Sequence, residues 1–198
     1  MNLKALHKLG YGLYVLSSRK GDRLNAQIAN TVFQITSEPP TVAVSISKTN
    51  LTHEYIRASN VFAVSMLCED TPLSFIGHFG FKSGREVDKL DGINYEIGET
   101  KAPIVIDNAV AYLECRVKHE VDVGTHTIII GELVAADVIS EKPCMTYEHY
   151  HQVKRGVTLR TAPATLKSKR RQHLRWQNIG ALYVAISTTP SRVTSKAT

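Results

Sequence analysis

The feature that most constrains the fold is a long alternation of apolar and polar side chains over residues 109–123. Odd positions are mostly apolar and even positions are mostly charged or amphipathic, which is the period of a strand with one buried and one solvated face. The run is long enough to bend around a barrel. Gly124 then turns the chain into a second long run, residues 125–139, where Gly131 indicates a bulge or a close backbone approach.

Four shorter runs are typical of strands, and three short segments are typical of helices. The predicted strands cover residues 12–18, 27–36, 41–47 and 61–67, and the predicted helices cover residues 51–58, 73–79 and 145–153. Long strands with short helices between them favour an all-β barrel with peripheral helices over a doubly wound α/β fold. A Rossmann fold has no support, because no G-x-G-x-x-G follows a strand.

Charge is distributed unevenly along the 198 residues, whose net charge is +6. Residues 1–148 carry 14 basic and 18 acidic side chains, whereas residues 149–198 carry 10 basic and no acidic ones. We therefore expect one domain over residues 1–163 and a basic, poorly ordered tail over residues 164–198. Nucleic-acid binding through this basic tail is a minor alternative. The mildly acidic body gives no indication of nucleic-acid binding.

Several classes of protein are disfavoured by what the sequence lacks. The three cysteines are far apart and form no C-x-x-C pair, so neither a disulfide framework nor a zinc knuckle is indicated, and we expect reduced thiols in the cytoplasm. The eight histidines show no metal-ligand spacing and no G-x-S-x-G motif is present, so we expect no metal and no hydrolase. No run approaches the ~20 apolar residues of a membrane helix, and a secretory signal is not expected.

Three segments carry side chains suited to a flat, anionic ligand. Residues 45–53 combine hydroxyl groups and Lys48 with a predicted helix start at Asn50, a combination that can bind phosphate. Residues 79–85 form a glycine-bearing basic stretch, and the polar side chains within residues 30–36 can contact the edge of a heterocycle. Each segment alone also fits an ordinary surface feature: a capped helix, a flexible loop, or the solvated side of a strand.

Taken together and in order, these segments resemble the flavin reductase-like family, whose fold is the FMN-binding split barrel. The resemblance covers about residues 2–163 and is greatest to the branch of ferric reductases, flavoredoxins and NADH:rubredoxin oxidoreductases. The stretches that carry it are Tyr11-Gly12-Leu13-Tyr14, Gln27-Ile28-Ala29-Asn30-Thr31-Val32-Phe33-Gln34, Ser37-Glu38-Pro39-Pro40, Asn50-Leu51-Thr52-His53, Phe75-Ile76-Gly77-His78-Phe79-Gly80-Phe81, Gly124-Thr125-His126-Thr127 with Gly131-Glu132, and residues 147–161.

The resemblance implies a β-dominated, Greek-key split barrel that forms a homodimer with one flavin per subunit, FMN rather than FAD. It implies isoalloxazine contacts from Asn30, Thr31 and Gln34. The implied ribityl and phosphate contacts come from Ser45, Lys48, Asn50 and Thr52, with Phe81, Lys82 and Lys89 closing the phosphate side. Thr36 and His53 are also expected to bind the cofactor. By the same resemblance, His126 is the expected catalytic residue beside the nicotinamide and the flavin, although a lone histidine there can also be purely structural.

The implied activity is that of an NAD(P)H-dependent flavin or ferric reductase. Electrons would pass from the reduced nicotinamide through the bound flavin to free flavin, a ferric chelate or a small redox protein. The alternative is an FMN electron carrier for a protein such as rubredoxin, with little NAD(P)H activity of its own. No long nicotinamide-binding motif is visible, which keeps that alternative open.

Overall fold

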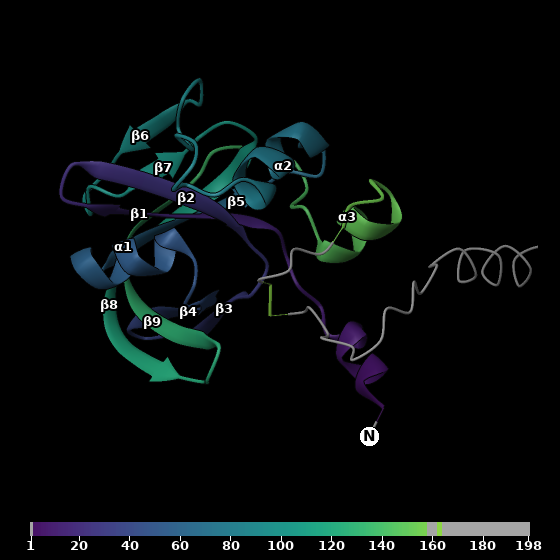
Figure 1. Cartoon of the computed structure of the whole chain (residues 1–198), viewed down its shortest axis with the longest axis horizontal. Helices are drawn as coiled ribbons and strands as arrows, with labels where there is room; N and C mark the ends of the chain where they lie inside the picture. The colour runs from purple at the N-terminus through teal and green to yellow at the C-terminus, as the bar shows by residue number, and fades with distance from the viewer. Residues whose placement is uncertain (1, 158–161, 164–198) are drawn as a thin grey trace, which may run out of the picture. The chain divides into compact units, whose positions relative to one another are not determined.

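The computed structural model describes residues 2–157, 162 and 163, which lie within one compact unit of the chain, Met1–Thr165 (Figure 1). The tail predicted over residues 164–198 lies outside the described residues. The strands are β1 (Tyr14–Lys20), β2 (Arg23–Ala29), β3 (Val32–Ser37), β4 (Pro40–Ser47), β5 (Val61–Leu67), β6 (Tyr95–Ile97), β7 (Pro103–Val105), β8 (Ala109–Asp122) and β9 (His126–Val138). The helices are the 3-10 helix η1 (Leu3–Lys8), α1 (Leu51–Ser59), α2 (Leu73–Phe81) and α3 (Tyr147–Gln152).

Seven of the strands form one antiparallel sheet in the order β2-β1-β5-β8-β9-β4-β3. The two edge strands, β2 and β3, are consecutive in the chain and are joined by only Asn30 and Thr31. Opposite edges can be joined by so short a link only if the sheet curls round until they meet. The fold is therefore a rolled sheet that remains split between β2 and β3, and the prediction of a β-dominated fold with peripheral helices is confirmed.

The core has an inner and an outer layer because side chains of a strand alternate between the two faces of the sheet. The inner layer fills the curl with buried side chains from β1, β4, β5, β8 and β9, including Leu16, Val44, Phe62 and Ile129. The outer layer lies under α2 and α3, and its buried side chains are Leu13, Val15, Ala26, Ile28, Leu67, Ile76, Phe79, Leu90, Val105, Met145 and Tyr150. Leu13 and Ile28, in the outer layer, also border the cavity described below.

The long β8–β9 hairpin confirms the expected strands but differs in how its faces are buried. The sequence places Glu114 on the solvated face, whereas the side chain is only 1 % exposed. Its Oε1 accepts hydrogen bonds from the Thr100 backbone N–H at 2.9 Å and from Thr100 Oγ1 at 2.5 Å, and its Oε2 accepts one from Glu99 N–H at 3.1 Å. The bulge beside Glu114 has its extra residue, Val134, on β9, so β8 keeps its alternation there. Glu114 is buried because the segment around β7 covers its face of the sheet, where Ala102 and Ile104 pack with Ala63, the cross-strand partner of Glu114.

The close approach expected at Gly131 is confirmed. A second bulge, between Val117 and His119, lies opposite Gly131 and Ile130. A Cβ at residue 131 would lie 2.6 Å from the Phe62 ring and 2.8 Å from Cys115 Cβ. Glycine is therefore required there because the β9 backbone packs directly on the inner core.

Other expectations need correction at element boundaries. The predicted strand over residues 27–36 is two strands, β2 and β3, which lie at opposite edges of the sheet. The break falls at residues 30–31, where the chain crosses the split, and a single Asn among β-prone residues was too weak a signal to mark it. Helix η1 and the β6–β7 pair carry no clear periodicity, and they were not predicted.

Candidate functional site

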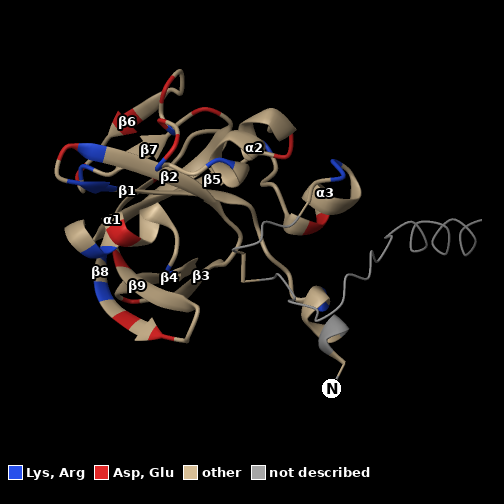
Figure 2. Ribbon diagram, in the orientation of Figure 1, with Lys and Arg blue, Asp and Glu red and all other residues tan. Residues whose placement is uncertain are grey.

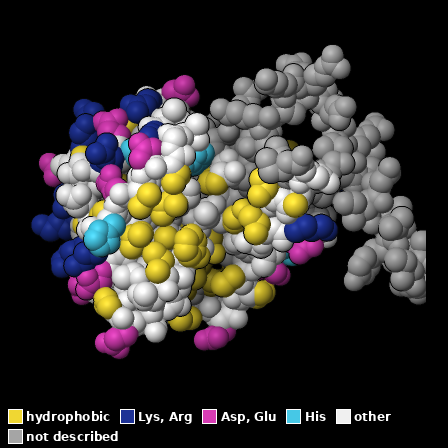
Figure 3. Space-filling view, turned by 90° about the horizontal axis from the view of Figure 1, so that it is seen from below, with side chains coloured by type: hydrophobic (Ala, Val, Ile, Leu, Met, Phe, Trp, Pro, Cys, Tyr) yellow, Lys and Arg dark blue, Asp and Glu magenta, His cyan; other side chains and the backbone are white. Residues whose placement is uncertain are grey.

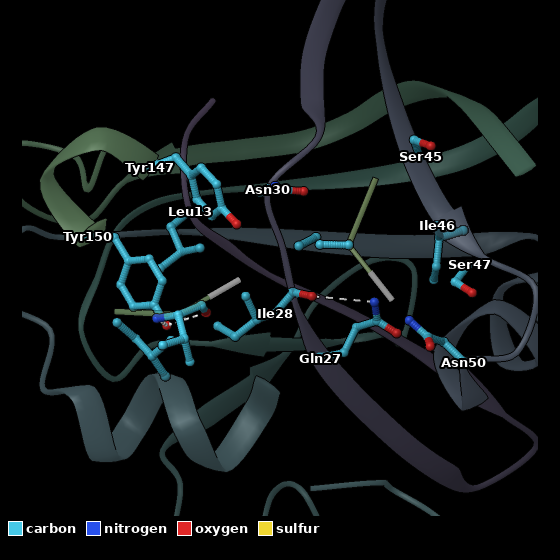
Figure 4. Close-up of a pocket in the computed structure, with 14 residues that line it drawn as sticks. Leu13, Gln27, Ile28, Asn30, Ser45, Ile46, Ser47, Asn50, Tyr147 and Tyr150 are labelled. Atoms are coloured by element: carbon cyan, nitrogen blue, oxygen red, sulfur yellow. Dashed lines mark hydrogen bonds between the residues drawn. The ribbon is translucent and has the colours of Figure 1, made fainter. Parts of the chain in front are cut away.

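A cavity lies where the split sheet, the start of α1 and the C-terminal segment of the described chain converge (Figure 4). One wall is polar and comes from the ends of β2 and β4 and from the residue before α1. The other wall is apolar and aromatic and comes from the residue before β1 and from β2, α2 and α3. The polar wall includes Gln27, Asn30, Ser45, Ser47 and Asn50, and the apolar wall includes Leu13, Ile28, Ile76, Tyr147 and Tyr150.

Asn30 contributes a buried amide to this cavity. The residue is 4 % exposed, and its Oδ1 accepts a hydrogen bond from Thr31 Oγ1 at 3.1 Å. Within the described residues, Asn30 Nδ2 has no hydrogen-bond partner. A buried amide donor without a partner costs about 1–3 kcal/mol, so this atom is suited to meet a ligand acceptor.

The start of α1 contributes backbone donors at the opposite end of the polar wall. Asn50 has the extended backbone of an N-cap residue, but among the described residues its side chain makes no capping hydrogen bond. Its amide instead lies with that of Gln27, and the two side chains point toward one another in Figure 4. The His53 N–H donates to Asn50 O at 3.1 Å, whereas the N–H groups of Leu51 and Thr52 receive no side-chain cap from Asn50 and are suited to an anion.

The aromatic wall belongs to α3, which Thr146 caps by accepting a hydrogen bond from His149 N–H at 3.0 Å. The rings of Tyr147 and Tyr150 stack with centroids 6.0 Å apart. Tyr150 Oη donates to the Val157 carbonyl at 3.1 Å, and burial raises the pKa of Tyr150. The segment after α3 is thus fastened to the helix that forms the wall.

Basic residues gather beside the start of α1, at the turn between β1 and β2 (Figure 2). Lys20 Nζ lies 2.7 Å from Glu54 Oε1, and Arg85 lies 3.2 Å from Glu54 Oε2. Because these two side chains hold its carboxylate, the pKa of Glu54 is lowered. Gly84 allows the basic loop to lie here, since a Cβ at this position would clash with Asn25 Oδ1.

Three of the predicted cofactor-binding residues come together in the cavity wall: Asn30, Ser45 and Asn50. Three others lie along β3 or at its start. Thr31 O accepts the Ser45 N–H at 3.1 Å, Gln34 Nε2 donates to Thr36 O at 3.2 Å, and Thr36 Oγ1 donates to Pro39 O at 2.6 Å. Gln34 and Thr36 are exposed on this edge strand.

Three more predicted cofactor-binding residues do not line the cavity and instead contact other parts of the protein: Lys48, Thr52 and His53. Lys48 Nζ forms an ion pair with Asp122 Oδ2 at 2.5 Å, at the end of β8. Thr52 Oγ1 is buried and accepts from Asn25 Nδ2 at 2.7 Å. His53 Nε2 lies 2.9 Å from Thr127 Oγ1, and burial followed by the nearby Arg57 charge lowers the His53 pKa.

The residues predicted to close the phosphate side lie in and after α2. Phe81 is 56 % exposed, and Lys82 is the C-cap residue of the helix. Lys89 is 2 % exposed, its Nζ donates to the His78 carbonyl at 2.5 Å, and burial lowers its pKa to about 8. In this structure Lys89 holds the last turn of α2.

The predicted catalytic residue, His126, lies at the start of β9. It is the cross-strand partner of Ser47, which lines the cavity, so the two side chains share one face of the sheet. His126 Nδ1 lies 2.8 Å from Thr125 Oγ1. The register thus places this imidazole beside the polar wall.

Several residues of the cavity were not singled out from the sequence as site residues. Gln27, Tyr147 and Tyr150 belong to stretches that carry the family resemblance, and the tyrosines are spaced i, i+3 on the third predicted helix. That spacing places both rings on one face of a helix. The complete wall therefore combines hydrogen-bonding groups on one side with aromatic rings on the other, which suits a flat heteroaromatic ligand with a polar edge.

Two further properties bear on what the site can hold. In residues 2–157, 162 and 163, no group of three or more His, Cys, Asp or Glu side chains could hold a metal ion. No helix in the described part of the chain is long and apolar enough to cross a membrane.

Comparisons with known proteins show the family to which the chain is similar. The sequence profile of the family described as "Flavin reductase like domain" matches residues 6–157. A "High molecular weight rubredoxin" of Moorella thermoacetica is 57 % identical over 163 residues, which cover 82 % of this chain and 71 % of that protein. A "Ferric-chelate reductase (NAD(P)H)" of Archaeoglobus fulgidus is 46 % identical over 169 residues, which cover 85 % of this chain and all of that one.

Solved structures of flavin-related proteins have a similar fold. An NADH:FAD oxidoreductase from Streptomyces globisporus superposes with a TM-score of 0.67 at 26 % identity, covering 73 % of this chain and 85 % of that one. A flavoredoxin from Methanosarcina acetivorans superposes with a TM-score of 0.61 at 25 % identity, covering 65 % of this chain and 69 % of that one.

Proposed function

This chain belongs to the flavin reductase-like family and is an oxidoreductase, and we propose that it binds FMN in the cavity between β2, β4 and α3 and uses NAD(P)H to reduce it. The observation that carries the proposal is the buried, unpartnered Asn30 amide in the cavity wall. When bound, the flavin would supply hydride and electron transfer. The protein would supply position, polarity and exclusion of water.

Each wall of the cavity has a role in this proposal. The amides of Gln27, Asn30 and Asn50 would hydrogen-bond the polar edge and the ribityl chain of the cofactor. The uncapped start of α1 would hold the phosphate, because backbone N–H groups and the helix dipole favour an anion there. Tyr147 and Tyr150 would cover the ring and keep water away from it.

His126 remains the proposed catalytic residue at the nicotinamide side. Its place opposite Ser47 supports this role, because Ser47 lines the cavity. The role expected for Lys48 at the phosphate stays a prediction, since its ammonium group is paired with Asp122 in this structure.

We also propose that the protein is a homodimer. Figure 3 shows apolar side chains gathered on the face that is seen from below Figure 1, where β3, β4, β8 and β9 lie. Exposed apolar residues of these elements include Phe33 (53 %), Ile35 (43 %) and Val121 (47 %). A second copy packed on this face would cover the β3 edge, which otherwise exposes unpaired backbone groups.

The reduced flavin would pass its electrons to an acceptor, which is free flavin, a ferric chelate or a small redox protein. The relative named ferric-chelate reductase supports the small-molecule acceptor. The relative named high molecular weight rubredoxin supports the second candidate, an FMN electron carrier that serves a redox protein.

The test is the visible absorption spectrum of the purified protein, recorded without oxygen before and after NADH or NADPH is added. We expect flavin absorption that is bleached by one of the two nucleotides. Flavin that persists with both nucleotides, but is reduced by a reduced redox protein, would identify the carrier. A colourless protein that takes up no added FMN would exclude both functions.

A further inference from the structure

Two cysteines that are far apart in the sequence, Cys68 and Cys144, face each other across an isolated antiparallel bridge. On one side of the pair, Met145 N–H donates to Leu67 O at 2.7 Å. On the other side, Glu69 N–H donates to Pro143 O at 3.0 Å. The cysteines therefore occupy a non-hydrogen-bonded position, where Cα atoms lie about 4.5 Å apart and both side chains stand on the same face.

That position meets the geometric requirement of a disulfide, whose Cα atoms lie about 4.4–6.8 Å apart. Both cysteines carry free thiols in this structure, Cys68 buried and Cys144 exposed. Cys68 Sγ lies 3.6 Å from Thr71 Oγ1, which itself donates to the Cys68 carbonyl at 2.7 Å. Thr71 thereby orients the buried thiol.

The surroundings of Tyr14 indicate that the Cys144 side chain lies on the same face of the sheet as that of Cys68. Tyr14 is paired with Met66, two residues before Cys68, so the three side chains share one side of the sheet. Burial first, and then the negative charge that Cys144 can carry, raise the pKa of Tyr14. The Tyr14 hydroxyl and the Cys144 thiol therefore lie close enough to interact electrostatically.

A salt bridge and a histidine–carboxylate contact join the two segments beside the cysteines. Lys142 Nζ lies 3.4 Å from Asp70 Oδ2, and His149 Nδ1 lies 3.6 Å from Glu69 Oε1. The residues that flank Cys144 are thus tied to those that follow Cys68. The opposition of the two cysteines is set by the two backbone hydrogen bonds of the bridge, and these side-chain contacts add to it.

We propose that Cys68 and Cys144 form a reversible disulfide that fastens the segment carrying α3 to the end of β5. A low-molecular-weight disulfide such as oxidised glutathione is the oxidant. The Cys144 thiolate, being exposed, attacks it, forms a mixed disulfide and releases one glutathione thiolate. The Cys68 thiolate then attacks Cys144 Sγ and releases the second, so two protein thiols lose two electrons and two protons.

This inference goes beyond the proposed function, and it concerns the chain whether or not a flavin is bound. Because Tyr147 and Tyr150 lie only three and six residues after Cys144, the disulfide would hold the aromatic wall against the cavity. In the reduced state the wall is retained by noncovalent contacts alone. Under oxidising conditions the bond would lower the rate at which α3 opens.

The experiment uses the full chain under native conditions, incubated with oxidised glutathione and then quenched by alkylation. We expect the loss of two titratable thiols and a peptide that links residues 68 and 144. In the oxidised protein, hydrogen exchange in α3 should be slower by severalfold than in the reduced protein. Dithiothreitol should restore both the thiols and the exchange rate.

Three variants make the result specific. Cys115→Ser should behave as the wild type, because Cys115 is fully buried and its pKa is raised to about 12 by that burial. Cys68→Ser should stop at a mixed disulfide on Cys144, and Cys144→Ser should not react. A wild-type product that carries only glutathione, a bond between two chains, or a link to Cys115 would overturn the proposal.

Discussion

At the scale of single residues, two buried polar side-chain atoms in the described chain have no hydrogen-bond partner, and they differ in where they lie. Asn30 Nδ2 lies in the wall of the cavity, whereas Ser65 Oγ lies in the interior of β5. Both groups lower the stability of the folded protein, since a buried donor is left unsatisfied. Only Asn30 is placed to recover that free energy from a ligand.

Replacing Asn30 by Ala is therefore expected to weaken FMN binding by up to about tenfold, the value of one neutral hydrogen bond. The stability of the apoprotein should stay unchanged or rise. Fluorescence titration with FMN and urea unfolding measure the two quantities. Ser65→Ala is the matched control, with the same expected effect on stability and none on affinity. An Asn30→Ala protein that binds FMN normally but unfolds more readily would make Asn30 a structural residue.

Lys89 gives the stability of the protein a specific pH dependence. Burial lowers its pKa to about 8 in the folded state, below the value of 10.5 that is normal for the group. Between these two values the unfolded chain binds more protons than the folded one, so the contribution of Lys89 to stability rises with pH. Below pH 8 the buried charge destabilises the folded state.

Lys89→Met should remove this rise. The difference in unfolding free energy between the wild type and the variant, measured from pH 7 to pH 9, should change by on the order of 1 kcal/mol in favour of the wild type. The difference between two proteins is needed because buried Cys115 titrates with the opposite slope above pH 9. The exposed Lys142→Met variant serves as the control, and an equal slope for both variants would contradict the assignment.

At the scale of elements, the short helix α3 depends on its cap. Its six residues make few hydrogen bonds, and Thr146 Oγ1 satisfies one of the first N–H groups. The same helix supplies the aromatic wall of the cavity. The stability of this one element is therefore coupled to access to the site.

Thr146→Ala should destabilise α3 by about 1 kcal/mol, the usual value of an N-cap. We expect faster hydrogen exchange confined to α3 and faster release of FMN after dilution. Thr146→Ser retains the hydroxyl group and should restore both rates. Acceleration spread evenly over the sheet would show that α3 does not open as a separate unit.

At the scale of the whole molecule, the proposed dimer predicts that a charge on the exposed apolar face prevents association. Phe33→Asp, at the β3 edge, should convert a dimer into a monomer in sedimentation velocity experiments, because a buried unpaired carboxylate is costly. Ile97→Asp is the matched control, since Ile97 is exposed to a similar extent, 52 %, on β6. A monomeric wild type or a dimeric Phe33→Asp protein would refute the proposed interface.

The strands and helices could be predicted because their signals are local. The alternation over residues 109–123 and the runs at 41–47 and 61–67 reflect backbone geometry that repeats every two residues. The three helices were predicted to within a few residues because their signals, a helix period and a cap residue, are also local. Asn30, Ser45 and Asn50, which the family resemblance implies as cofactor contacts, lie together in the cavity wall, and their cofactor-binding role stays a prediction.

Tertiary structure alone decided where side chains are directed and which distant residues meet. Lys48 is followed by a helix start, yet its ammonium group pairs with Asp122, which comes 74 residues later. Glu114 is buried because the segment around β7 covers its face of β8 and the backbone N–H groups of residues 99 and 100 donate to its carboxylate. Cys68 and Cys144 oppose each other only because β5 and the segment before α3 share a bridge. Sequence periodicity describes one element at a time, whereas these contacts depend on the register between elements, which is set by the packing of the whole sheet.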